Sequence, residues 1–145
     1  LLLSLKKLRN PLSTLFYKLS IADENEINII ANEVNLTESL SVLAGQLSHG
    51  QKQWLEIGML LAQKPNLLLI DEPAAGMTAP ERKKTVDLLK KLSKNQSVIV
   101  VEHDMEFVKS LECRVTVLHE GGVLAEGSLD YVSQNEKVID VYLGR

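Results

Sequence analysis

The sequence lacks a phosphate-binding loop of the GxxxxGK type, because none of its 8 glycines is followed by lysine. It has 1 cysteine, Cys113, which cannot form a disulfide within the chain and is typical of a reducing compartment. The clearest apolar runs, 67–70 and 98–101, are far shorter than the roughly 20 residues that a membrane helix needs. Residues 1–3 are leucines without a preceding basic segment, so we predict no signal peptide there.

A strong excess of one charge is also missing. The chain has 16 basic and 19 acidic side chains, giving a net charge of −3, and this composition offers no case for nucleic-acid binding. Aromatic residues make up only 4% and apolar residues 45%, as in an ordinary soluble protein of 145 residues that can form one hydrophobic core. The chain begins with leucine rather than methionine, which we interpret as the start of a fragment.

The hydrophobic pattern predicts an α/β protein in two unequal parts, with helices alone in residues 1–64 and alternating strands and helices in residues 65–145. In the first part the predicted helices are 1–8, 21–34, a short one from Thr37 or Ser39 to Gly45, and one from Ser48 to Pro65. In the second part the predicted strands are 67–70, 98–101, 115–118 and 123–125, and the predicted helices are 79–92, 104–111, one from Ser128, and 138–143. Strands separated by helices of this length indicate βαβ crossovers and a parallel sheet.

The first two predicted strands, 67–70 and 98–101, are apolar without alternation, which is typical of strands covered on both faces. Ligands of open parallel sheets bind beyond the carboxyl ends of the strands. Asp71 and Glu72 follow the first strand, and His103 follows the second. We therefore predict that these three side chains meet at one edge of the sheet.

Asp71 and Glu72 have the chemistry that phosphate transfer requires. An aspartate at a strand end can hold the magnesium of a nucleotide, directly or through water, because Mg²⁺ prefers few carboxylates together with phosphate oxygens. The adjacent glutamate can then orient or deprotonate an attacking water. The alternative is that these residues and Pro73 merely end a strand in a solvated turn.

Residues 47–51 put Ser48 and Gly50 at the start of a helix. Free backbone N–H groups and the helix dipole attract phosphate at such a place, where Ser48 adds a hydroxyl donor and Gly50 allows close approach. The alternative is plain N-capping by Ser48, and both uses are compatible because they occupy the same helix end.

The remaining candidate polar residues are two histidines, His103 and His119, and the pair Thr78 and Glu81. A neutral His103 could bridge a terminal phosphate and the water-activating carboxylate, although a lone histidine is more often structural. His119 we assign to a hairpin. Thr78 and Glu81 have the spacing of a capping box and are interpreted as structural.

In their order and spacing these motifs resemble the ATP-binding subunit of ABC transporters. The resemblance covers nearly the whole chain and implies a partial P-loop NTPase fold, with a helical subdomain at residues 1–64 and the C-terminal part of the ATPase core at residues 65–145. The matching segments are 47–51 for the signature motif LSGGQ, 67–72 for Walker B with its catalytic glutamate, 75–78 for the D-loop, and His103 for the switch histidine.

The resemblance implies a mechanism in which two such subunits close face to face over two ATP molecules. Ser48 and Gly50 would then contact the γ-phosphate held by the other subunit, with Gln51 as a weaker contact of the same kind. Closure and hydrolysis would drive transmembrane permease subunits.

Within its own subunit, the same resemblance implies that Asp71 holds Mg²⁺, that Glu72 is the general base, and that His103 contacts the γ-phosphate. The implied cofactors are ATP and Mg²⁺. The implied location is the cytoplasmic face of the bacterial inner membrane, as a peripheral subunit.

The chain departs from the family pattern in several places. His49 replaces the first glycine of the signature motif, and Thr78 replaces the aspartate that usually ends the D-loop. The Walker A and Q-loop motifs should precede the helical region, and neither is present in this sequence. We therefore expect the chain alone to bind ATP no more tightly than about millimolar and not to hydrolyse it by itself. We also expect the chain to expose an apolar edge and face of its sheet.

Other segments resemble the branched-chain amino acid importer group, and within it most closely the ATP-binding subunit of urea importers. These segments are 54–59, 74–78, 102–107 and 138–145. The alternatives are a branched-chain amino acid importer ATPase or a truncated, non-catalytic interaction module. A soluble ABC-type ATPase acting on DNA or ribosomes is disfavoured, because the acidic chain has no basic surface or coiled-coil insertion.

Overall fold

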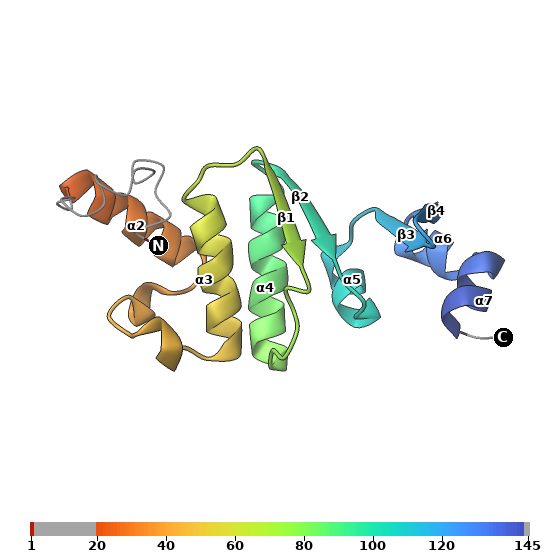
Figure 1. The fold of residues 1–145 in the computed structure, drawn as a ribbon, viewed down its shortest axis with the longest axis horizontal. Coiled ribbons are helices and arrows are strands. Elements are labelled where there is room, and N and C mark those ends of the chain that lie inside the picture. Colours follow the sequence, from red (N-terminus) through yellow and green to blue (C-terminus); the bar gives the residue numbers. More distant parts are fainter. Residues whose placement is uncertain (2–19, 144–145) are drawn as a thin grey trace. The chain divides into compact units, whose positions relative to one another are not determined.

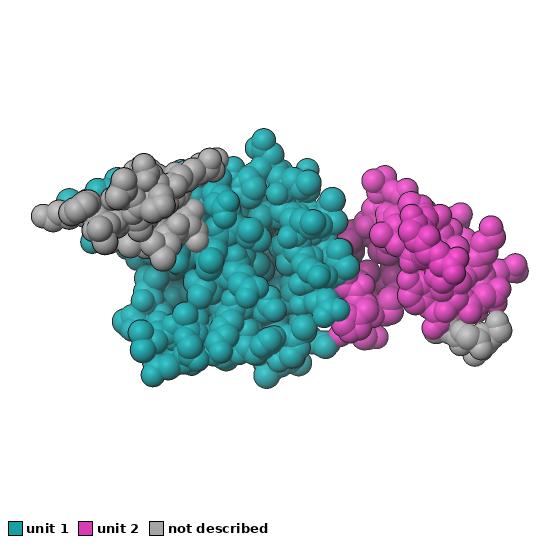
Figure 2. Space-filling model, in the orientation of Figure 1, with its two compact units in different colours: residues 1–101 teal, residues 102–145 magenta. Residues whose placement is uncertain are grey.

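The computed structural model describes residue 1 and residues 20–143, so the predicted helix over 1–8 lies outside the described residues apart from its first position. The chain forms two compact units, Leu1–Val101 and Glu102–Arg145 (Figure 2). The two units are defined by contacts between residues in space. The boundary between residues 64 and 65 was predicted from the change in hydrophobic pattern, and it stays a prediction.

The elements of each unit are drawn in Figure 1. In the first unit they are α2 (Ile21–Glu33), the 3-10 turns η2 (Thr37–Ser39) and η3 (Ala44–Gln46), α3 (His49–Leu61), β1 (Leu67–Asp71), α4 (Ala79–Leu92) and β2 (Ser97–Val101). In the second unit they are α5 (Met105–Leu111), β3 (Val115–His119), β4 (Gly122–Gly127), α6 (Leu129–Ser133) and α7 (Glu136–Leu143). No helix among these described elements is long and apolar enough to cross a membrane.

Helices α3 and α4 lie side by side and form the centre of the first unit (Figure 1). The helix predicted over 79–92 is confirmed as α4, and it buries one face made of Thr85, Val86, Leu88, Leu89 and Leu92. Helix α3 buries Trp54 and Ile57, and α2 packs on its carboxyl end through Ile30 and Ala62. The arrow of β1 points toward the end of the unit where α3 and α4 begin (Figure 1).

The predicted parallel pairing of the first two strands is confirmed, with Leu69 opposite Ile99 and Asp71 opposite Val101. The two strands are covered on one face only, which confirms the expectation that this chain exposes an apolar sheet face. Leu68 is 1% exposed on the inner face, whereas Leu69 is 65% exposed on the outer face, where Ile99 and Val101 are exposed too. Within the described part of the first unit, nothing covers this outer face, and it is apolar.

An apolar strand face of this kind favours association of the chain with itself. We expect the chain alone to self-associate at micromolar concentration, and Leu69→Lys to reduce that association by placing a charge on the face. Sedimentation velocity measures the change. The control is Ile29→Lys, because Ile29 is 67% exposed on α2. An equal effect of both substitutions would contradict the role of the sheet face.

The strand predicted over 115–118 is confirmed as β3, which pairs with β4 in an antiparallel hairpin. That β3 joins the parallel sheet stays a prediction. The turn explains this pairing. Glu120 and Gly121 both have positive φ, 48° and 77°, as two-residue hairpin turns require, and the chain therefore returns beside β3. The predicted hairpin itself is confirmed.

The short helix predicted between Thr37 and Gly45 is also wrong. The segment forms the separate 3-10 turns η2 and η3, and its apolar side chains Leu40 and Leu43 are 43% and 71% exposed. A helix this short forms few backbone hydrogen bonds, which do not offset the conformational entropy lost by ordering its residues. Without a buried apolar face the helix therefore does not form.

Candidate functional site

The N-terminus of α3 is built by a reciprocal cap between Ser48 and Gln51. The Ser48 Oγ accepts from the Gln51 backbone N–H at 3.2 Å, and the Gln51 Oε1 accepts from the Ser48 N–H at 3.0 Å. The predicted capping role of Ser48 is confirmed. Gln51 has a further contact, because its Nε2 donates to the Ser39 Oγ at 3.1 Å. Gln51 therefore ties the start of α3 to η2.

The start of α3 is also tied to α4 through Glu81. The Ser48 Oγ donates to the Glu81 Oε1 at 3.1 Å, while the Glu81 Oε2 accepts from the Thr78 backbone N–H at 2.9 Å and from its hydroxyl at 2.7 Å. The predicted pairing of Thr78 and Glu81 is confirmed. The bonds from Thr78 hold the pKa of the Glu81 carboxyl below its usual range, with a smaller contribution from Ser48, so this side chain is charged at neutral pH.

A buried hydrogen bond fixes α3 against α4 one turn further on. The Trp54 Nε1 donates to the Thr85 Oγ1 at 2.8 Å, and the Thr85 hydroxyl is within 3.0 Å of the Glu81 carbonyl oxygen. Lys84 lies over the Trp54 ring, with its Nζ 5.8 Å from the ring centroid. These contacts position the helix start that carries Ser48 and Gly50.

The D-loop-like segment contacts the start of α3 at Gly76. Its φ of 63° lies in the left-handed region, and a Cβ added there would be 3.0 Å from the His49 Cδ2. His49, the departure from the LSGGQ pattern, therefore lies against Gly76. Sequence spacing could not reveal this contact, because it joins two segments that are far apart in the chain.

Asp71 and Glu72 lie at the carboxyl end of β1, and both are exposed. Asp71 is the last residue of the strand, opposite Val101. Glu72 has a φ of 44°, and its backbone N–H donates to the Val101 carbonyl oxygen at 2.9 Å. The two carboxylates thus stand at the strand end where the sequence predicted a ligand site.

The donor set at this strand end fits a magnesium ion held jointly with a nucleotide. Mg²⁺ usually takes one or two carboxylates and completes its shell with phosphate and water oxygens. Asp71 supplies an exposed carboxylate, with Glu72 next to it. Across residues 1 and 20–143, no group of three or more acidic, histidine or cysteine side chains could hold a metal by itself.

His103 belongs to the second unit, where it is exposed and precedes α5. Its backbone N–H donates to the Glu102 Oε2 at 3.2 Å. Asp104 caps α5, the helix predicted over 104–111, since its Oδ1 accepts from the Phe107 N–H at 3.1 Å. The predicted meeting of His103 with Asp71 and Glu72 stays a prediction.

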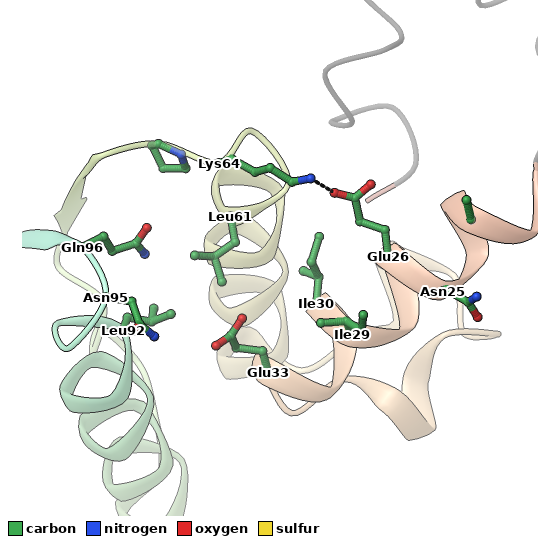
Figure 3. Close-up of a pocket in the computed structure, with 12 residues that line it drawn as sticks. Asn25, Glu26, Ile29, Ile30, Glu33, Leu61, Lys64, Leu92, Asn95 and Gln96 are labelled. Atoms are coloured by element: carbon green, nitrogen blue, oxygen red, sulfur yellow. Dashed lines mark ion pairs between the residues drawn. The ribbon is translucent and has the colours of Figure 1, made fainter.

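A groove lies in the first unit between α2 and the carboxyl ends of α3 and α4 (Figure 3). It is lined by apolar side chains such as Ile29 and Leu61, and an ion pair of 2.6 Å joins Lys64 Nζ to Glu26 Oε1 at its rim. None of the predicted site residues lines this groove.

Comparison with known proteins identifies the class. The family model described as "ABC transporter" matches residues 3–75, half of the chain. The chain therefore belongs to the ABC transporter family. The α/β fold agrees, because a solved nucleotide-free ATP-binding cassette from an ABC transporter superposes on the whole chain with a TM-score of 0.82 and 25% identity, and the chain covers 61% of it.

Two curated relatives are similar over most of the chain. The high-affinity branched-chain amino acid transport ATP-binding protein BraF of Pseudomonas aeruginosa is 40% identical over 114 residues, which are 77% of this chain and 45% of that protein. The protein LivG of Escherichia coli, with the same description, is 34% identical over 113 residues, which are 77% of this chain and 44% of that protein. The chain thus spans about half the length of the curated relatives it matches.

Proposed function

We propose that this chain is the C-terminal part of the ATP-binding subunit of an ABC importer. The observation that carries the proposal is the capped N-terminus of α3, which holds the Ser48 hydroxyl and Gly50. These residues belong to the segment 47–51 that resembles the signature motif of the family. Such a helix end favours an anion through its N–H groups and its dipole. Two subunits close over ATP. The γ-phosphate held by one subunit then meets three residues of the other subunit: Ser48, Gly50 and Gln51.

Hydrolysis uses the strand end in the same subunit as the bound ATP. Glu72 takes the proton of the water that attacks the γ-phosphate while ADP leaves, and Asp71 would hold Mg²⁺. When bound, the metal neutralises charge on the phosphate oxygens. His103 contacts the γ-phosphate and orients it toward Glu72.

Closure of the pair of ATP-binding subunits, identical or different, moves permease subunits in the membrane. The subunit lies on the cytoplasmic face of the bacterial inner membrane. Both curated relatives named above are branched-chain amino acid transport proteins, which favours an amino acid as the solute. Urea or a short amide is the narrower candidate, and it rests on the sequence resemblance alone. Uptake of labelled leucine and labelled urea by cells with and without the gene decides between them.

A titration with magnesium-ATP tests the proposal. The chain is measured alone and as a completed subunit, meaning this chain joined to the N-terminal half of the Pseudomonas aeruginosa relative. We expect the chain alone to bind no more tightly than about 1 mM, or roughly −4 kcal/mol, because the proposed contacts of Ser48 act only on the ATP of another subunit.

The completed subunit should bind ATP at micromolar concentration and dimerise with it. Ser48→Ala should leave ATP binding to the monomer unchanged. It should weaken the ATP-dependent dimer about tenfold for each of the two ATP sites, since one charge-assisted hydrogen bond is lost at each site. Micromolar binding by the chain alone, or an unchanged dimer of the variant, would contradict the assignment of Ser48 to the partner's ATP.

A further inference from the structure

The carboxylate of Glu81 lies at the N-terminus of α3, where the proposed function places the γ-phosphate held by the partner subunit. A Cβ added to Gly50 would be 2.7 Å from the Glu81 Oε1 and 2.8 Å from its Cδ. The same oxygen accepts from the Ser48 Oγ at 3.1 Å. One anionic group of the chain therefore occupies the space above Gly50 and uses the hydroxyl of Ser48.

The two oxygens of Glu81 have different partners. Oε2 is held by the Thr78 N–H and hydroxyl, at the start of α4, whereas Oε1 reaches across to Ser48. The carboxylate can therefore leave Ser48 by a side-chain rotation and keep its bonds to Thr78. The bonds that cap α4 use Oε2 and do not involve Ser48.

We propose that Glu81 is a positioning residue that occupies the phosphate site at the start of α3 in the nucleotide-free subunit and is displaced when the γ-phosphate of the partner subunit arrives. This inference rests on the proposed function. Both groups are anionic and need the same hydroxyl and the same space above Gly50, so they exclude each other. Glu81 thereby keeps Ser48 in place before closure and raises the ATP concentration at which closure occurs.

Glu81→Gln separates this role from a structural one. The amide oxygen of glutamine can still accept from the Thr78 N–H, so the cap of α4 is kept, while the negative charge at Ser48 is removed. We expect the variant to dimerise at about three- to tenfold lower ATP concentration than the parent, with a melting temperature lower by no more than a few degrees. The control is Glu56→Gln, which removes an exposed carboxylate from α3 outside the site.

The experiment uses the completed subunit with Glu72→Gln as the parent, so that bound ATP persists, and follows dimer formation by analytical ultracentrifugation during an ATP titration. In a second parent that also carries Ser48→Ala, Glu81→Gln should shift the midpoint less, because the shared hydroxyl is gone. An unchanged or higher midpoint for Glu81→Gln in the first parent overturns the inference.

A separate measurement distinguishes failure of the inference from failure of the proposed function. The carboxyl pKa of Glu81 is followed by ¹³C NMR in the nucleotide-free completed subunit, with and without Ser48→Ala. A rise of the pKa in the variant supports the contact with Ser48, and no change overturns it. If the contact is present but the parent forms no dimer with ATP, the proposed function fails, and with it the displacement of Glu81.

Discussion

Glu72→Gln in the completed subunit is expected to lower ATP hydrolysis about a hundredfold or more while leaving ATP binding intact. The reason is that glutamine keeps the size of the side chain but cannot accept a proton from the attacking water, and general base catalysis commonly contributes a factor of about 10² to 10⁴. Phosphate release measures the rate, and gel filtration with ATP should show a dimer that persists because the nucleotide is not consumed.

The matched control for this prediction is Glu56→Gln, which changes an exposed carboxylate on α3 and should leave the hydrolysis rate within about twofold. Asp71→Asn should act differently from Glu72→Gln, because losing the carboxylate proposed to hold Mg²⁺ should weaken the binding of magnesium-ATP as well as its hydrolysis. A Glu72→Gln variant that hydrolyses ATP at the normal rate would falsify the assignment of the base.

The largest expected effect on stability comes from Trp54→Ala. The side chain is 4% exposed between α3 and α4, and its Nε1 makes the buried bond to Thr85. Removing it leaves a cavity and a hydroxyl without its donor, with an expected loss of about 3–5 kcal/mol in the free energy of unfolding. Since domains are stable by only about 5–15 kcal/mol, the variant should be largely unfolded at moderate urea concentration.

Urea unfolding of Trp54→Ala must be followed by far-UV circular dichroism, because the sequence has 1 tryptophan and the substitution removes the fluorescent probe. Thr85→Val serves as the comparison, since it removes only the hydrogen-bonding hydroxyl, and it should cost about 1–3 kcal/mol. Lys84→Ala, which removes a cation near the ring, should cost less than about 1 kcal/mol. Equal losses for all three variants would mean that packing of Trp54 is not the dominant contribution.

Elements with a long apolar repeat could be predicted from the sequence. The 14-residue helix α4 was predicted because several turns repeat the same pattern, and the strands β1 and β2 were predicted from uninterrupted apolar runs. The turns η2 and η3 could not be predicted, since their residues lack a face to bury and their conformation depends on contacts such as Gln51 with Ser39.

The site could be predicted in part, for a similar reason. Motif residues such as Ser48 and Glu72 carry a local signal at a helix start or a strand end. Glu81 was interpreted as structural because its spacing from Thr78 explains one oxygen, and the contact of the other oxygen with Ser48 exists only in three dimensions. The sequence predicted that an apolar face of the sheet would be exposed, but it could not show which face of β1 this chain covers.

The backbone at Glu72 has a consequence for engineering. Its φ of 44° costs an ordinary residue about 1 kcal/mol or more, and glycine would adopt the same conformation without that cost. A library selected only for resistance to heat or protease would therefore enrich glycine at position 72 and discard the carboxylate. Selection for ATP turnover would enrich glutamate again, so the two screens should drive this single position in opposite directions.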